Sequence, residues 1–216
     1  TRNSWASTIT VPELRTLWDA AAEKKVTTWK QVRAEWPDRE ITLFGPGAES
    51  GTFDYFTDAI NGRAGASRKD YTSSADDEVI VKGVADDELA LGYVGHGYVE
   101  KHRQQIKALA VDDLDDRVGR GPIEPSLENV SRGIYRPLAR PLFIYVNTAR
   151  AQRPEVAAFA RYFVRKSREL AADVGSVPMM GLAYQLAEQR LEKKATGTMF
   201  KAPNAAELGV EYLLTQ

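Results

Sequence analysis

Apolar residues recur along the chain with two spacings, one typical of helices and one typical of strands. Segments with apolar side chains three or four positions apart predict amphipathic helices, and short apolar runs bounded by Gly, Pro or charged residues predict strands. The predicted helices span residues 10–22, 26–36, 51–61, 74–84, 154–172 and 181–194. Capping boxes are predicted at Thr10 with Glu13 and at Ser74 with Asp77, and Phe53, Phe56 and Ile60 are spaced for one buried face. The predicted strands span residues 41–44, 90–94, 106–111 and 141–146. Strands that alternate with helices in this way predict an α/β fold.

The second half of the chain carries the two strongest apolar signals. The run "PLFIYV" at residues 141–146 is continuous rather than alternating, so it predicts a strand buried on both faces. The helix predicted over residues 154–172 has an apolar stripe, with Pro154 near its start and Gly175 just beyond its end. The polar stretches at residues 62–74 and 112–125 predict loops.

Composition narrows the class of protein. The 216 residues are 43% hydrophobic and 27% charged, which suits one large domain or two lobes. A formal net charge of −1 gives no broad basic field, so we expect no nucleic-acid partner. No run of about 18 apolar residues is present, so no membrane span is predicted. Without cysteine, the chain can form neither disulfides nor thiolate metal sites.

The stretch "ITLFGPGAESGTFDYFTDAI", residues 41–60, predicts a strand, a small-residue turn and a helix. The first N–H groups of a helix have no partner within it, and the helix dipole adds about half a positive charge there. Ser50 as N-cap, with Gly51, Thr52 and Phe53 in the first turn, would offer main-chain donors and two hydroxyls to one point. The pattern predicts an anion site, and a plain capped turn is the alternative.

Three familiar motifs do not fit this turn. A P-loop requires Lys before the Ser/Thr, and "GPGAESGT" has none. The third glycine of a dinucleotide fingerprint would come one residue late, at Gly51. A nucleophile elbow requires glycines two residues either side of Ser50, where the chain has Ala48 and Thr52.

Four ordered blocks then resemble the phosphate-binding proteins of bacterial phosphate ABC transporters, which are type II periplasmic substrate-binding proteins. They are "LFGPGAESGTFDYFTDAI", "SRKDYTSSADDEVIVKGV", "ALGYVGHGY" and "RPLFIYV", and the similarity covers roughly residues 8–185. The resemblance implies two α/β lobes that close over one phosphate ion without chemistry. It also implies delivery to an ABC permease and a location outside the cytoplasm, periplasmic or with a lipid anchor on the full-length precursor.

The family's Ser-Gly-Thr phosphate ligands map onto Ser50, Gly51 and Thr52, and the amide of Phe53 extends the same turn. Many members carry an arginine four residues before that serine, where this chain has Pro46. A guanidinium fork suits a pair of phosphate oxygens. We therefore expect Arg68, in "SRKDY", to supply the charge from the following loop, with a solvated loop residue as the alternative.

The chain also departs from the family at its start, because the strand and helix that open the first lobe have no counterpart. Residues 1–140 would then form the second, ligand-binding lobe, complete, and residues 141–216 the hinge return strand and C-terminal helices of a partial first lobe. Three alternatives follow: the sequence is a fragment, a companion chain carries the remaining segment, or the protein is a diverged half-site protein. A half-site open to water should bind phosphate weakly and discriminate poorly among oxyanions.

Other function classes receive less support. His96 and His102 are the only histidines, and their spacing does not predict a metal pair. The cluster "DDLDD" lacks the order of a calcium loop. A serine hydrolase with Ser50 as nucleophile and His96 as base, and a ligand-free interaction domain, are the alternatives. We expect a protein that is not an enzyme, with no cofactor and no metal.

Overall fold

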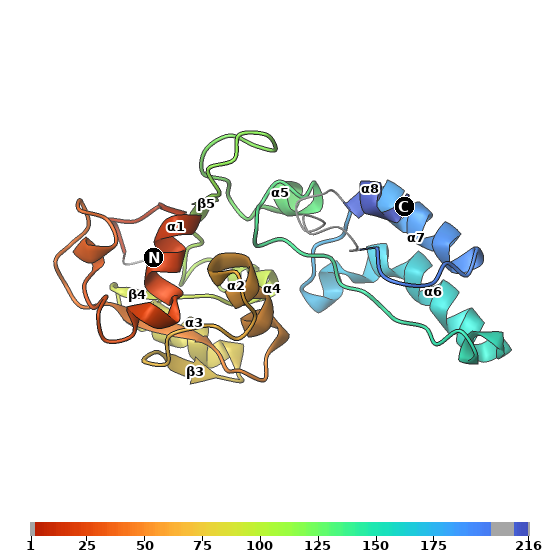
Figure 1. Ribbon diagram of the computed structural model, residues 1–216, viewed down its shortest axis with the longest axis horizontal. Coiled ribbons are helices and arrows are strands. Elements are labelled where there is room, and N and C mark those ends of the chain that lie inside the picture. The colour runs from red at the N-terminus through yellow and green to blue at the C-terminus, as the bar shows by residue number, and fades with distance from the viewer. Residues whose placement is uncertain (1–2, 200–209, 216) are drawn as a thin grey trace. The chain divides into compact units, whose positions relative to one another are not determined.

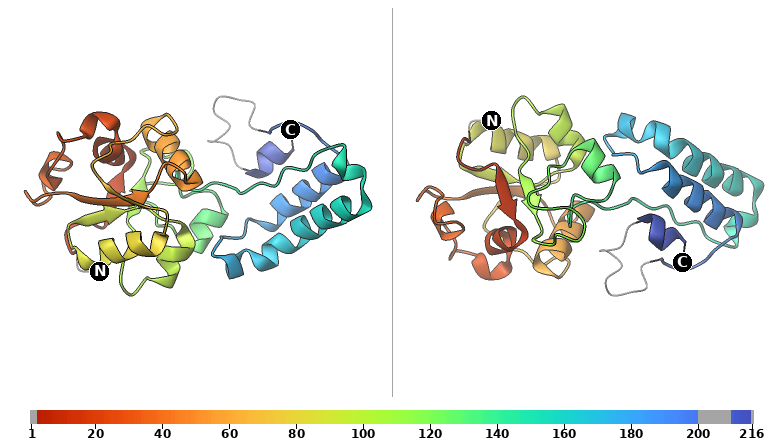
Figure 2. Two further views of the ribbon diagram at one scale, coloured as in Figure 1. Left: turned by 90° about the horizontal axis from the view of Figure 1, so that it is seen from below. Right: turned by 90° about the horizontal axis from the view of Figure 1, so that it is seen from above.

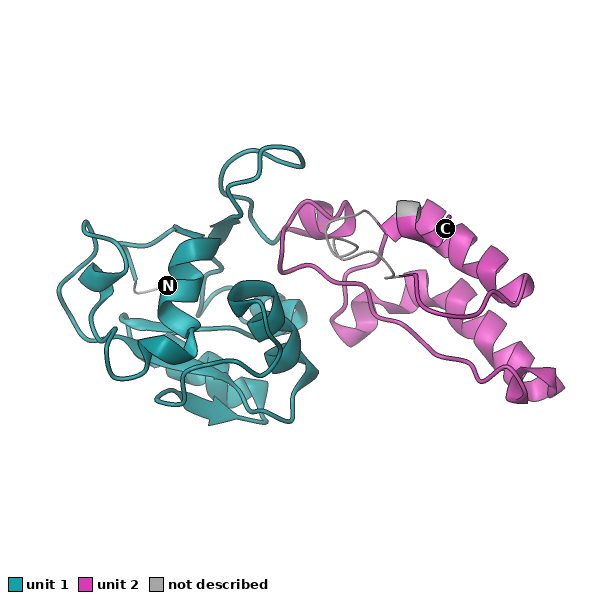
Figure 3. Cartoon of the chain, viewed as in Figure 1, with its two compact units in different colours: residues 1–125 teal, residues 126–216 magenta. Residues whose placement is uncertain are grey.

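The chain divides into two compact units, residues 1–125 and 126–216 (Figure 3). The computed structural model describes residues 3–199 and 210–215. The boundary between the two units lies after residue 125, whereas the lobe expected from the sequence extends to residue 140. Among the described residues, no helix is both long and apolar enough to cross a membrane.

The centre of the first unit is a three-stranded parallel sheet in the order β3–β2–β4, and Figure 1 labels its two outer strands, β3 and β4. It consists of β2 (Thr42–Pro46), β3 (Thr72–Ser74) and β4 (Ala90–Gly92). Phe44 of β2 is level with Thr72 on one side and with Gly92 on the other. All three strands therefore end at the same edge of the sheet.

Three helices connect or cover these strands. They are α1 (Val11–Trp18), α2 (Gly51–Asn61) and α3 (Asp77–Asp86). α3 packs on all three strands, and α2 contacts both β2 and α1. α2 begins and ends at the predicted residues, and it buries Phe53, Phe56 and Ile60, which the sequence placed on one face. The predicted capping box at the start of α1 is also present, with Thr10 and Glu13 bonded to each other.

The rest of the first unit is built from short elements. β1 (Thr8–Thr10) pairs in parallel with β5 (Ala110–Asp112), a partner about a hundred residues away. The α4 helix (His96–Lys101) follows β4, and the 3-10 turns η1 (Ala20–Ala22) and η2 (Trp29–Gln31) follow α1. Thus the predicted helix over residues 10–22 ends as a 3-10 turn, and the helix predicted over residues 26–36 forms only as the 3-10 turn η2 followed by turns.

In the second unit, the described elements are helical. They are α5 (Leu127–Ser131), η3 (Arg150–Gln152), α6 (Pro154–Leu170), η4 (Ala172–Val174), α7 (Gly181–Glu192) and α8 (Val210–Leu214). α6 and α7 lie side by side, and α8 packs on α7 (Figure 2). The predicted helices over residues 154–172 and 181–194 are confirmed to within two residues at each end.

The strand predicted over residues 141–146 is wrong. This segment joins no sheet, and Leu142 and Tyr145 are 71% and 90% exposed. A strand forms only with a neighbour to receive its main-chain hydrogen bonds, and the described part of this unit offers none. The predicted stripe of α6 is likewise only partly buried, because Ala160 is covered while Phe159 and Phe163 are exposed.

Two smaller predictions in the first unit are corrected. The polar stretch 62–74 was predicted as loop, but residues 72–74 pair with β2 as β3. Ser74 was predicted to cap the next helix, but Asp76 caps α3 by accepting from the amide of Glu78, and Ser74 accepts from Asp76 instead.

Candidate functional site

The candidate site lies at the carboxyl edge of the β3–β2–β4 sheet. β2 is central, and the chain leaves it through α2 to β3 on one side, then crosses through α3 to β4 on the other. The strand order therefore reverses between β2 and β4. In open parallel sheets, ligands bind outside the carboxyl ends of the strands at such a switch point. The turn that carries Ser50 leaves the sheet at this edge.

Ser50 is the N-cap of α2. Its backbone is extended, with φ −91° and ψ 128°, and its Oγ accepts a hydrogen bond of 3.1 Å from the amide of Thr52. The amide of Ser50 in turn donates to the carbonyl of Gly47 at 3.0 Å, so the turn is closed before the helix begins. This capping fixes the direction in which the first amides of α2 point.

Two main-chain donors in this turn have no protein acceptor among the residues that the structure describes. They are the amides of Gly51 and Phe53, while the amide of Asp54 already donates to the carbonyl of Ser50. The hydroxyl of Thr52 also lacks a partner in the same range, and the hydroxyl hydrogen of Ser50 remains available to donate. These two amides and two hydroxyls belong to the donor set predicted for an anion. The amide of Thr52 was part of that prediction, but it donates to Ser50 in the cap.

The four predicted residues of the turn contribute differently. Gly51 is exposed, and Ser50 and Thr52 are half-buried, so all three can reach a ligand. The Phe53 side chain is 6% exposed and belongs to the core, so only its amide is available. Buried Thr57 holds the helix further, because its Oγ1 donates to the carbonyl of Phe53 at 2.8 Å. The cap and this bond are both made by residues of the turn and of α2 itself.

Arg68 is not brought to this turn. It lies four residues before β3, whereas Ser50 follows β2, so the two approach parallel strands from opposite edges of the sheet. Its side chain is 5% exposed, and Nε and Nη2 donate to Asp70 at 2.5 and 2.8 Å. Its Nη1 donates to the carbonyls of Leu17 and Val26, both at 3.1 Å.

These contacts give Arg68 a structural role, in which it ties the loop before β3 to the end of α1. The paired Arg68 guanidinium lowers the pKa of the Asp70 carboxyl to about 2. No hydrogen bond of Arg68 is directed to the turn at residues 50–53. That Arg68 binds phosphate stays a prediction.

Acidic residues follow two of the three strands of the sheet, β2 and β3. Glu49 precedes Ser50 after β2, and Asp76 and Asp77 follow β3. Burial raises the pKa of the Asp77 carboxyl, and the charges of Asp76 and Glu78 raise it further. An anion at this edge would therefore be held by main-chain dipoles and hydroxyls against nearby negative charge.

The two histidines are engaged elsewhere. His96 Nε2 lies 2.8 Å from the carbonyl oxygen of Pro125, and no hydrogen bond joins His96 to Ser50 in the described part of the chain. His102 Nε2 lies 2.8 Å from Glu78. No group of three or more His, Asp or Glu side chains that could hold a metal ion occurs among the described residues.

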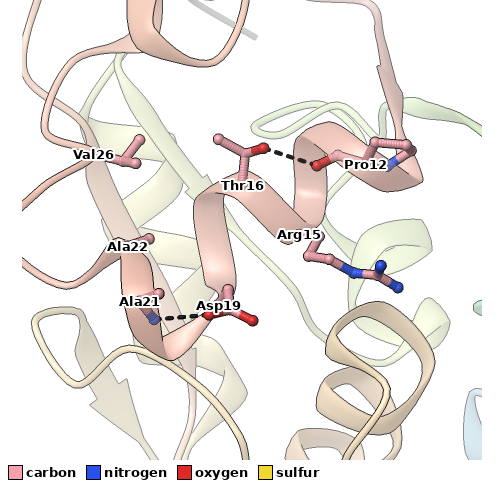
Figure 4. Close-up of a pocket in the computed structure, with 7 residues that line it drawn as sticks. All are labelled: Pro12, Arg15, Thr16, Asp19, Ala21, Ala22 and Val26. Atoms are coloured by element: carbon pink, nitrogen blue, oxygen red, sulfur yellow. Dashed lines mark hydrogen bonds between the residues drawn. The ribbon is translucent and has the colours of Figure 1, made fainter.

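A shallow hollow of about 370 Å³ lies on another part of the first unit (Figure 4). It is lined by residues of α1, η1 and the following turn: Pro12, Arg15, Thr16, Asp19, Ala21, Ala22 and Val26. Arg15 donates from Nε to the carbonyl of Ile60 at 2.7 Å, near the end of α2 opposite the capped turn. The hollow contains none of the predicted site residues.

The sequence did not predict that Tyr71 bonds to the start of this turn. Tyr71 donates from its hydroxyl to the carbonyl of Pro46 at 2.8 Å, where β2 ends and the turn begins. Gly45, the residue before Pro46 in β2, lies next to both tyrosine rings of this cluster. A Cβ there would come within 2.8 Å of the Tyr93 ring, and it would lie 3.4 Å from the Tyr71 ring. A glycine between the apolar residues of a strand was the available signal, because it often marks a close approach.

Comparison with known proteins gives consistent findings. Residues 11–167 match the family described as "PBP superfamily domain". The chain is 44% identical over 214 residues to protein SphX of Synechocystis sp., an alignment that covers 99% of this chain and 62% of that protein. It is 26% identical over 191 residues to the phosphate-binding protein PstS of Staphylococcus saprophyticus, covering 88% and 56% of the two chains.

A solved structure extends the likeness to the fold. The crystal structure of a possible phosphate binding protein from Planctomyces limnophilus matches with a TM-score of 0.78 and 39% sequence identity. The match covers 90% of this chain and 67% of that one. The chain spans less than two thirds of the length of SphX and PstS, at 62% and 56%.

Proposed function

The chain belongs to the PBP superfamily, and on that premise we propose that it binds inorganic phosphate at the N-terminus of α2 as the substrate-binding component of a phosphate ABC transport system. The donors of the site are the amides of Gly51 and Phe53 and the hydroxyls of Ser50 and Thr52. A phosphate ion offers four oxygens that accept hydrogen bonds, which suits a set made only of donors.

The observation that carries this proposal is the pair of main-chain amides without a protein acceptor in the described structure, at Gly51 and Phe53. The first four N–H groups of a helix point along its axis, where the helix dipole is positive. Gly51 has no Cβ, so an oxyanion can approach the main chain closely. SphX, PstS and the Planctomyces structure support phosphate as the anion.

The remaining parts of the proposal concern the setting. The protein acts outside the cytoplasm and delivers phosphate to a membrane permease, and a lipid anchor on the full-length precursor would hold it there. It performs no chemistry on the ion. Ser50 and His96 make their hydrogen bonds to different partners, which argues against the serine hydrolase alternative.

We also propose that residues 1–140 form the ligand-binding lobe and that residues 141–216 belong to the first lobe. The second unit exposes large apolar side chains on the segment at 142–145 and on α6, including Tyr145, Phe159 and Tyr162 at 90%, 63% and 57%. Such surfaces in a folded protein usually pack against something. A companion segment or chain that completes the first lobe would cover them.

Calorimetric titration of the chain with phosphate tests the proposal. The wild type should bind phosphate, and Ser50→Gly should bind about tenfold more weakly, because one charge-assisted hydrogen bond is lost while the cap conformation is kept. Asp58→Asn, on the last turn of the same helix, is the control and should not weaken binding. Absence of heat with the wild type, in phosphate up to ten millimolar, would overturn the proposal.

A further inference from the structure

We propose that Tyr71 is a positioning residue of this site, which holds the turn of residues 46–50 in place through the carbonyl of Pro46. The inference rests on the proposed function for its consequence, phosphate affinity, but its structural part can be measured without any ligand. Tyr71 is not one of the proposed ligand-binding residues 50–53, and under the proposed function it does not contact phosphate.

The hydrogen bond lies at the junction between β2 and the turn that follows it. The hydroxyl of Tyr71 donates to the carbonyl of Pro46 at 2.8 Å, and Pro46 is the last residue of β2. Proline has no N–H, so Pro46 cannot contribute a donor to the sheet ladder at this point. Four residues later, Ser50 caps α2. A shift of the Pro46 carbonyl would therefore move the cap and the amides that follow it.

Tyr71 is itself held firmly by ring packing. Its ring meets that of Trp18 edge-on, with centroids 5.4 Å apart, and Trp18 is 1% exposed. The ring also lies against the backbone of Gly45. Burial raises the pKa of the Tyr71 hydroxyl, and the charge of Glu49 raises it further, so the hydroxyl remains protonated and donates at neutral pH.

Tyr93 offers a matched comparison within the same aromatic cluster. Its ring packs edge-on against Trp18 at 4.9 Å and stacks on Phe56 at 3.9 Å. Its hydroxyl is buried but has no hydrogen-bond partner in the part of the chain that the structure describes. Removing the hydroxyl from Tyr93 therefore breaks no bond to the turn, whereas removing it from Tyr71 breaks one.

The test compares Tyr71→Phe with Tyr93→Phe. Both variants keep the ring and delete one hydroxyl, so packing is matched. Tyr71→Phe should weaken phosphate binding about fivefold by calorimetry, because the donors are no longer aimed at one point. Tyr93→Phe should bind as the wild type does. Equal affinities for Tyr71→Phe and the wild type would overturn the inference, as would equal weakening in both variants.

A second readout is independent of phosphate. In ¹⁵N–¹H spectra of the free proteins, the amide signals of Gly51 and Phe53 should move in Tyr71→Phe and stay in place in Tyr93→Phe. If the wild type fails to bind phosphate while these shifts occur, the positioning role stands and the proposed function falls. If the amide signals of Gly51 and Phe53 do not move in Tyr71→Phe, the positioning role falls regardless of binding.

Discussion

Under the proposed function, Ser50 would use one hydroxyl for two contacts. Its oxygen accepts from the amide of Thr52 and so caps α2, and its hydrogen is free to donate to a ligand. The cap and the proposed ligand contact therefore depend on the same hydroxyl group. Substitutions by alanine and by glycine both remove this hydroxyl, but they affect the stability of the helix start differently. Replacing an N-cap serine with alanine costs about 1 kcal/mol, whereas glycine costs only a few tenths.

The pair Ser50→Ala and Ser50→Gly separates these functions. Both should lose phosphate affinity, because both lack the hydroxyl. Only Ser50→Ala should also lose about 1 kcal/mol in the free energy of unfolding, measured by urea denaturation without phosphate. Full phosphate affinity in Ser50→Gly would show that the hydroxyl does not contact the ion.

Glu49 is expected to oppose anion binding. It is exposed and precedes Ser50, and its carboxylate folds back over Gly47, where a Cβ would lie 2.5 Å from Oε2. Glu49→Gln should tighten phosphate binding about threefold at low salt and by less at high salt, because repulsion between nearby charges is screened. Asp58→Asn changes the net charge equally and should have no such effect. Weaker binding in Glu49→Gln would mean that the carboxylate is a ligand.

The Arg68–Asp70 pair should make stability depend on pH. The pKa of Asp70 is lowered from 3.8 to about 2 in the folded protein, so the pair stabilises fully above the unfolded value and less as the pH falls toward 2. Asp70→Asn should flatten this part of the curve of unfolding free energy against pH between about 4 and 2. It should also destabilise the protein at neutral pH by about 3 kcal/mol, because Arg68 is left buried without its partner. An unchanged curve would remove this pair as a stabilising feature.

At the scale of elements, the sequence predicted a helix or strand correctly where the contacts that determine it join residues close in sequence. The capped turn and apolar face of α2 fixed its bounds correctly, because caps and periodicity involve residues close in sequence. β3 was missed because three polar residues became a strand only by pairing with β2. The contacts of Arg68 with the carbonyls of Leu17 and Val26 join residues more than forty positions apart, which no local pattern could predict.

The packing of α3 on the sheet supplies a prediction at this scale. A Cβ at Gly83 would lie 2.3 Å from Cε1 of Phe44, so helix and strand are in direct contact there. Gly83→Ala should destabilise the protein by about 2 kcal/mol despite the higher helix propensity of alanine, because overpacking outweighs it. Adding Phe44→Leu should restore part of the loss in a double-mutant cycle. Greater stability in Gly83→Ala alone would contradict this packing.

At the scale of the molecule, the two units should respond differently to the ligand. The proposed site belongs wholly to residues 1–125, while the exposed apolar side chains of α6 belong to residues 126–216. A ligand that binds only the folded state of one unit raises the unfolding temperature of that unit. In scanning calorimetry, millimolar phosphate should raise the transition of the first unit and leave that of the second. A rise confined to the second unit would place the site there instead.

The fold class followed from the alternation of elements, but the tertiary setting of the second unit did not. The run at residues 141–146 has the composition of a buried strand, and its burial depends on which strands surround it. The likeness to phosphate-binding proteins and the physics of helix ends both predict a site at residues 50–53, and the structure bears out the predicted N-cap at Ser50. The contact that Arg68 makes with Leu17 could not be predicted locally, and phosphate binding by Arg68 stays a prediction.

The most direct test of the central claim is a phosphate titration followed by ¹⁵N–¹H correlation spectra of the whole chain. Saturable shifts should be largest at the amides of Gly51 and Phe53, the two main-chain donors without a protein acceptor in the described structure. Chloride at equal ionic strength should leave them in place. Saturable shifts centred elsewhere, or none at Gly51 and Phe53, would contradict the claim that this helix end binds the ion.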